Sequence, residues 1–85
     1  MNTSEIEQKV REIVAKKFDA QLETLTADTN LANDLGLDSF AAVELMFELE
    51  EAFDLKIPDS QIEHIRTIRD IVTYLDEWLQ KNGRK

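Results

Sequence analysis

The stretch Asn33–Phe40, which reads NDLGLDSF, leads directly into a helix predicted over residues 39–53. Asp38 is a favourable N-cap residue, and its carboxylate would lie at the positive end of the helix dipole. Ser39 would then occupy the first turn, where unpaired backbone N–H groups favour an anion. Two interpretations follow: Ser39 caps the helix itself, or its hydroxyl is placed to carry a phosphodiester.

The predicted helix 39–53 has two apolar faces. One spans an arc of about 100°, the width of a core-facing stripe. It consists of Ala42, Leu45, Met46, Leu49 and Phe53. A second strip, centred about 140° away, consists of Phe40, Val43 and Phe47, with Glu44 and Glu51 at its border. Either these three residues enter the core of a small bundle, or they form an exposed docking strip whose acidic border meets basic residues of a partner.

Outside this helix, apolar residues at helical spacing predict three more helices, over residues 4–18, 60–65 and 67–81. Each begins with a pair at capping-box spacing: Ser4 and Glu7, Ser60 and Glu63, Thr67 and Asp70. Gly83 is predicted to end the last helix. The connection 19–38 contains five leucines that can pin it to the core, so we expect it to be ordered. The sequence therefore predicts one all-α domain over residues 1–85, a small four-helix bundle with a short third helix and a long first connection.

The charge of the chain is concentrated in its middle. The net charge is −8, and residues 28–63 contain ten acids and a single base, Lys56, which sum to −9. This distribution argues against nucleic-acid binding, which requires a basic surface. The acidity predicts protein partners with basic patches, although it could instead serve solubility alone.

Several other classes of protein are also disfavoured. The chain has no cysteine, no apolar run long enough to span a membrane and no signal-peptide pattern, so we expect a cytoplasmic protein without disulfides. Ser39 lacks the glycines of a nucleophile elbow, and His64 has no sequence context that marks it as a base. A calcium loop starting at Asp28 would need Gly and Glu where Asn33 and Ser39 stand. We therefore expect no enzyme and no dedicated metal site, while loose ion binding by the acids stays open.

The motif around Ser39 and the blocks that follow it resemble acyl carrier proteins. The matching residues are Asp34-Leu35-Gly36-Leu37-Asp38-Ser39-Phe40, Val43-Glu44-Leu45, Leu49-Glu50-Glu51, Phe53 and Ile57-Pro58-Asp59. The likeness extends over nearly the whole chain. It implies a four-helix bundle in which a phosphopantetheinyl transferase attaches 4'-phosphopantetheine, taken from coenzyme A, to Ser39, flanked by Asp38. The carrier would hold acyl groups as thioesters and deliver them, as a monomer, to acyl-transferring and condensing enzymes.

The resemblance also implies roles for residues beyond Ser39. Partners would dock on this side of the helix: Glu44, Glu50 and Glu51 would meet basic patches on those enzymes, beside Phe40, Val43 and Phe47. The residues expected to line a cavity for the acyl chain are Leu45, Met46, Leu49, Ile57, Ile65 and Ile71. The chain departs from the family pattern at three positions. Leucine is usual in place of Phe40, many fatty-acid carriers have an acidic residue in place of Ala41, and a smaller aliphatic residue is usual in place of Phe47.

Three functions are consistent with these observations. The first is a discrete carrier for fatty-acid or related lipid biosynthesis. The departures at Phe40, Ala41 and Phe47 favour a specialised carrier for polyketide, special-lipid or aminoacyl cargo. A function of a different class is an acidic helical interaction or ion-binding domain that is never modified.

Overall fold

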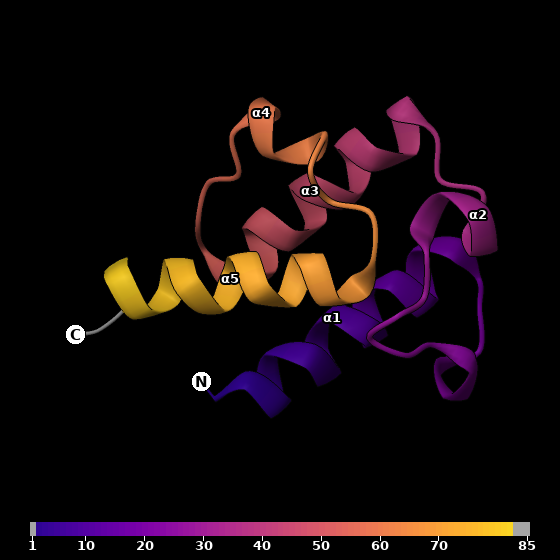
Figure 1. Ribbon diagram of the computed structural model, residues 1–85, viewed down its shortest axis with the longest axis horizontal. Helices are drawn as coiled ribbons and strands as arrows, with labels where there is room; N and C mark the ends of the chain where they lie inside the picture. The colour runs from indigo at the N-terminus through magenta and orange to yellow at the C-terminus, as the bar shows by residue number, and fades with distance from the viewer. Residues whose placement is uncertain (1, 83–85) are drawn as a thin grey trace.

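A computed structural model describes residues 2–82 of the protein. Most of these residues are helical (Figure 1). In chain order the helices are α1 (Thr3–Phe18), the 3-10 helix η1 (Leu22–Thr24), α2 (Leu31–Leu35), α3 (Ser39–Phe53), α4 (Asp59–Ile62) and α5 (Ile68–Asn82). Extended pairing within the described residues is limited to an isolated bridge between Asn30 and Thr67. The predicted all-α class is confirmed, with α2 as a helix that the sequence analysis did not predict.

The core is formed by one face of each long helix. On α3 the predicted stripe is buried throughout, and Leu45 and Leu49 are fully inaccessible to solvent. The buried residues that face it from α1 and α5 are Ile6, Val10, Val14, Ile68, Ile71, Val72 and Leu75. Burial of aliphatic and aromatic side chains is the main contribution to the stability of such a bundle. Helix α3 therefore has one face committed to the core, which leaves its other face free for function.

Two of the three capping boxes predicted outside α3 do not form. Helix α1 begins at Thr3, because Asn2 and Glu5 form the capping box: the Glu5 N–H donates to Asn2 Oδ1 at 2.9 Å and the Asn2 N–H to Glu5 Oε1 at 3.0 Å. Ser4 therefore lies inside the helix. Helix α4 spans Asp59–Ile62 rather than 60–65. Its N-cap is Pro58, whose side chain has no hydrogen-bond donor or acceptor.

The start of α5 matches its prediction. The Thr67 N–H donates to Asp70 Oδ2 at 3.1 Å, and the Asp70 N–H donates to Thr67 Oγ1 at 3.2 Å. Asp70 Oδ2 also accepts the N–H of Arg66 at 2.9 Å. The predicted stop at Gly83 lies outside the described residues.

The connection 19–38 is ordered, as expected, and it is attached to the start of α5. We call this attachment the seam: residues 27–31 pair with residues 66–69 through three backbone hydrogen bonds. The N–H groups of Leu31, Ile68 and Arg69 donate to the carbonyls of Arg66 (2.9 Å), Thr29 (3.3 Å) and Ala27 (2.8 Å) respectively. Leu25 and Leu31 are buried in the core. The seam and these leucines fix the segment that leads to α3.

The start of α3 lies at the end of the molecule away from the start of α1 and the end of α5 (Figure 1). Helix α1 packs against α5 and α3, and α4 packs against α3. The residues at the start of α3, Asp38, Ser39 and Phe40, are exposed to solvent.

Candidate functional site

The chain reaches Ser39 through a tight turn after α2. Asn30 caps α2, because its Oδ1 accepts the N–H of Asn33 at 2.8 Å. Gly36 ends it in the left-handed conformation, with φ +76°, which glycine adopts without steric cost. A Cβ at this position would meet no atom within 4 Å, so the requirement for glycine is one of backbone conformation, not of space. The Leu37 N–H then donates to the Leu31 carbonyl at 3.0 Å, which directs the chain into α3.

Asp38, and not Ser39, caps α3. Asp38 Oδ1 accepts the N–H of Ala41 at 2.8 Å. Ser39 is exposed, and its hydroxyl has no hydrogen-bond partner among residues 2–82. The alternative in which Ser39 serves only as the cap is therefore wrong.

The first turn of α3 has unpaired donors. Within the described chain, the backbone N–H groups of Asp38, Ser39 and Phe40 donate to no protein acceptor. Such N–H groups, together with the positive end of the dipole of a 15-residue helix, favour an anionic group. A phosphodiester on the Ser39 hydroxyl fits these surroundings, and a free hydroxyl is available to form it.

The second apolar strip of α3 is exposed, so its assignment to the core is excluded. Phe40 is 72% exposed, Val43 44% and Phe47 62%. They are the exposed large hydrophobic side chains of the part of the chain that the structure describes. Apolar side chains grouped on one surface typically mark a site of interaction. We call these three residues the apolar strip.

The acids predicted beside this strip fall into three different settings. Glu44 forms an ion pair with Lys17 of α1, and Glu48 approaches the same ammonium group at 3.8 Å. Glu50 Oε2 accepts the N–H of Ile57 at 2.7 Å, which holds the α3–α4 loop against the helix. Glu51 is exposed and has no partner among the described residues. Among the predicted docking acids, Glu51 is thus the one that forms no hydrogen bond or ion pair with the described part of the chain.

Five of the six predicted cavity residues meet in the core. Leu45, Met46, Leu49, Ile57 and Ile71 are buried in one hydrophobic cluster. Ile65 is half-buried and packs against that cluster from the segment after α4. It also lines a surface hollow of about 300 Å³, together with Leu37 and with residues of α2. Ile65 is therefore the member of the set that connects the core to an opening near the start of α3.

Sequence reasoning missed two basic residues of α1 that organise the site. The Arg11 guanidinium donates to the Leu25 carbonyl at 3.0 Å and the Leu22 carbonyl at 3.1 Å, and so anchors the connection that precedes the serine. Lys17 contacts α3, and its hydrogen bond to Glu44 raises the pKa of Lys17 above its ordinary value. Both residues lie off the apolar stripe of α1, which marks them as candidates for polar contacts. Their partners could not be identified from the sequence, because they lie far away along the chain.

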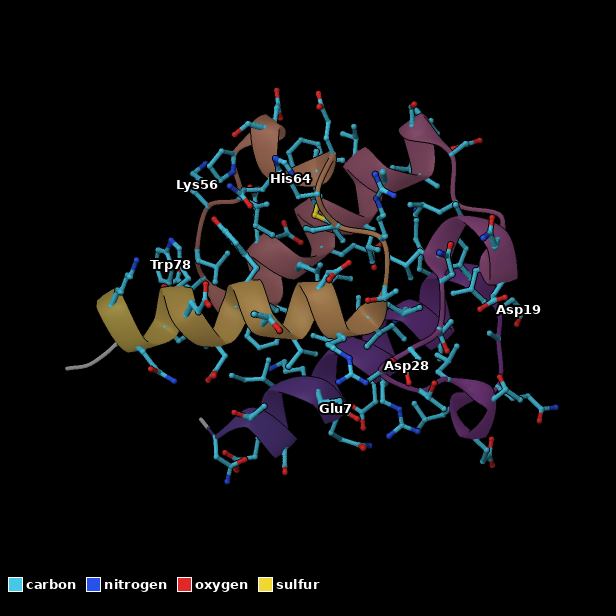
Figure 2. The ribbon with its side chains drawn as sticks, viewed as in Figure 1. Glu7, Asp19, Asp28, Lys56, His64 and Trp78 are labelled. Carbon is cyan, nitrogen blue, oxygen red and sulfur yellow. The ribbon has the colours of Figure 1, made fainter. Side chains whose placement is uncertain are left out.

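Histidine and acidic side chains were the candidates for acid–base or metal chemistry. His64 is exposed, and Figure 2 shows it beside α4, well apart from Glu7, Asp19 and Asp28. No group of three or more acidic or histidine side chains in the described ranges is arranged to hold a metal ion. Within residues 2–82, no helix has both the length and the apolar character needed to cross a bilayer.

Comparisons with known proteins decide the family. A family model for the phosphopantetheine attachment site matches residues 8–75. An acyl carrier protein of Amoebophilus asiaticus is 47% identical over 76 residues, which cover 89% of this chain and 95% of the relative. The chain belongs to the acyl carrier protein family. An acyl carrier protein of Syntrophobacter fumaroxidans is 43% identical over 75 residues, covering 88% of this chain and 93% of that one.

A solved acyl carrier protein structure also matches the fold. The protein from Enterococcus faecalis superposes with a TM-score of 0.76 at 34% identity, covering 91% of this chain and 98% of the other. Acyl carrier proteins carry a covalently attached 4'-phosphopantetheine and interact with phosphopantetheinyl transferases and biosynthetic enzymes. They are carriers, not catalysts.

Proposed function

We propose that this acyl carrier protein bears its phosphopantetheine arm on Ser39 and serves enzymes of fatty-acid or related lipid biosynthesis in the cytoplasm. The observation that carries the proposal is the exposed Ser39 hydroxyl, which lies at the start of α3 while the neighbouring Asp38 supplies the cap. When bound, the arm supplies a terminal thiol that holds acyl groups as thioesters. The protein's own part is to present the hydroxyl, to favour the phosphodiester beside free N–H groups and to dock its partners.

Docking is assigned to the apolar strip and its acidic border. An enzyme surface with an apolar residue can cover Phe40 and Phe47, while its arginine or lysine residues meet Glu51 and Glu44. Glu50 stays in the predicted set, with one carboxylate oxygen already bonded to the Ile57 N–H. The negative charge of this segment would also steer basic partners toward the serine over a longer range.

The acyl chain is proposed to insert between α3 and α5. Leu45, Leu49 and Ile71 offer a fully apolar lining, and Ile65 stands at the hollow through which a chain could enter. Insertion would require these tightly packed side chains to move apart, because a filled core has no room for a guest.

Intact mass spectrometry tests the attachment. After incubation with coenzyme A and a broad-specificity phosphopantetheinyl transferase, the protein should gain the mass of one phosphopantetheine group. Ser39→Ala should abolish this gain and leave the free energy of unfolding within about 0.5 kcal/mol, because the side chain makes no hydrogen bond. Ser60→Ala, a change at another exposed serine near a helix start, is the matched control and should leave the gain intact. A mass gain that survives Ser39→Ala would refute the proposal.

A second candidate function is carriage of a specialised cargo. It is favoured by the exposure of Phe40 and Phe47, two of the positions that depart from the family pattern, because partners read this surface. The mass of the thioester-bound group on protein isolated from its native host distinguishes the two: saturated acyl chains of varied length indicate lipid synthesis, and one defined polyketide or aminoacyl group indicates a dedicated pathway.

A further inference from the structure

Lys17 near the end of α1 makes a contact with α3 beside the apolar strip. Its ammonium group pairs with Glu44 and lies 3.8 Å from Glu48 Oε2. The Lys17 side chain is only 17% exposed, whereas the side chains of Glu44 and Glu48 are 44% and 45% exposed. The lysine side chain is therefore largely covered, while its two acids remain accessible from solvent.

The carboxylate that Lys17 occupies belongs to the proposed docking border. On a helix, residues three and four apart are neighbours, so Glu44 lies next to both Phe40 and Phe47. A partner cation placed to accompany an apolar contact with the strip would meet this carboxylate. Glu51 lies on the same flank of α3, two turns further along, and has no partner in the described chain.

We propose that Lys17 is an internal competitor for the cation of a docking partner, an inference that rests on the proposed docking function. A partner with arginine or lysine beside its apolar residue meets the free Glu51 at once, and it gains Glu44 only by displacing Lys17. Part of the attraction between carrier and partner is thereby offset within the carrier itself. The effect suits a protein that must leave one enzyme to reach the next, since weaker charge pairing speeds dissociation.

The test compares two neighbouring lysines. Lys17→Met removes the ammonium group and keeps most of the covered stem, and Lys16→Met makes the same change in net charge at an exposed position that contacts no acid of α3. The probe is a synthetic amphipathic helical peptide with leucines on one face and arginines beside them, and calorimetry gives its affinity at low and high salt. In parallel, each variant is incubated with coenzyme A and a phosphopantetheinyl transferase, and the mass gain is followed.

Lys17→Met should bind the peptide about two- to five-fold more tightly at low salt, the range that an exposed ion pair contributes. Lys16→Met should bind as the unaltered protein does. The increase in peptide affinity should disappear at high salt. In a Glu44→Gln background, the peptide affinity of Lys17→Met should differ little from that of the Lys16→Met control.

Equal effects of the two lysine changes would overturn the inference, because net charge alone would then explain both. Weaker binding by Lys17→Met would overturn it as well, since Lys17 would then be a contact residue. The attachment at Ser39 is judged separately: absence of a mass gain refutes the proposed function, and the peptide titration still decides the role of Lys17.

Discussion

Helices α3 and α5 begin in opposite ways, although each has an acidic or hydroxyl side chain at its N-cap. At α5, every backbone N–H from Arg66 to Asp70 has an acceptor, supplied by Asp70, by Thr67 and by the carbonyls of the seam. At α3, the N–H of Ala41 is paired with Asp38, and the three N–H groups before it have no acceptor in the described chain. We call the first a closed start and the second an open start.

One residue accounts for much of this difference. The third helical position, which supplies the reciprocal acceptor of a capping box, is Asp70 in α5 and Glu5 in α1. In α3 the same position is Ala41, which has no acceptor. The comparison teaches that a helix start can have all of its N–H groups paired within the chain or can leave some of them open to an external acceptor, and that α5 has the first form and α3 the second.

The largest stability effect is expected at the closed start. Asp70→Ala leaves the N–H groups of Arg66 and Thr67 without their acceptor, and should lower the free energy of unfolding by about 1–2 kcal/mol. Thermal unfolding followed by circular dichroism should show a fall in Tm of about 4–8 °C per kcal/mol for a chain of this size. Glu77→Ala, at an exposed position of the same helix, is the control for loss of one negative charge.

This effect should depend on pH in a defined direction. Burial tends to raise the pKa of Asp70, but the hydrogen bonds from the N–H groups of Arg66 and Thr67 outweigh burial and leave the pKa below its ordinary value. A carboxyl group whose pKa is lowered in the folded protein stabilises the native state at pH values above its ordinary pKa of about 4. That contribution to stability is lost as the pH falls further. The difference between the unaltered protein and Asp70→Ala should therefore shrink between pH 6 and pH 3; a constant difference would contradict a role for the charged form.

At the open start the corresponding loss should be smaller. Asp38→Ala removes one hydrogen bond, to Ala41, and should cost about 0.5–1 kcal/mol of unfolding free energy in a urea titration. Asp38→Asn, which keeps an acceptor oxygen, should recover most of it. If Asp38→Ala were as destabilising as Asp70→Ala, the distinction between the two starts would be lost.

The smallest expected change is a gain. Ala41→Gln places an acceptor where a capping box has one, and its side chain can accept the N–H of Asp38. The free energy of unfolding should rise by about 0.3–0.5 kcal/mol, and modification of Ser39 should persist because the N–H groups of Ser39 and Phe40 stay free. Ala32→Gln, at an exposed position of α2, is a control for the added side chain. A decrease in stability would show that something other than the missing acceptor keeps α3 open.

The sequence predicted the features of the fold that depend on local pattern. The bounds of α3 at 39 and 53 are confirmed, because Asp38 is a strong cap and the apolar stripe ends at Phe53. The exposed apolar strip follows from the same periodicity. The error at α1 arose because Asn2 and Ser4 are both good caps two residues apart, and only the reciprocal bond with Glu5 selects Asn2. Helix α2 is too short for its periodicity to be recognised, although Asn30 and Gly36 carry its start and stop signals.

The features that were not predicted depend on contacts between distant segments. Neither Arg11 with the carbonyls of Leu22 and Leu25 nor Lys17 with Glu44 can be read from spacing along one helix. The same holds for Glu50, which was predicted as a docking residue and proves also to bind the Ile57 N–H. Such pairings become visible only when the helices are placed against one another.

The seam has a consequence for how the protein is made. The segment that leads to Ser39 is fixed by backbone bonds from Leu31 to Arg66 and from Arg69 to Ala27, which join the first half of the chain to the second. During synthesis the first half emerges first, and these distant contacts must wait until the later residues are available. The backbone hydrogen bonds that fix the stretch before Ser39 can therefore form only after the start of α5 has left the ribosome.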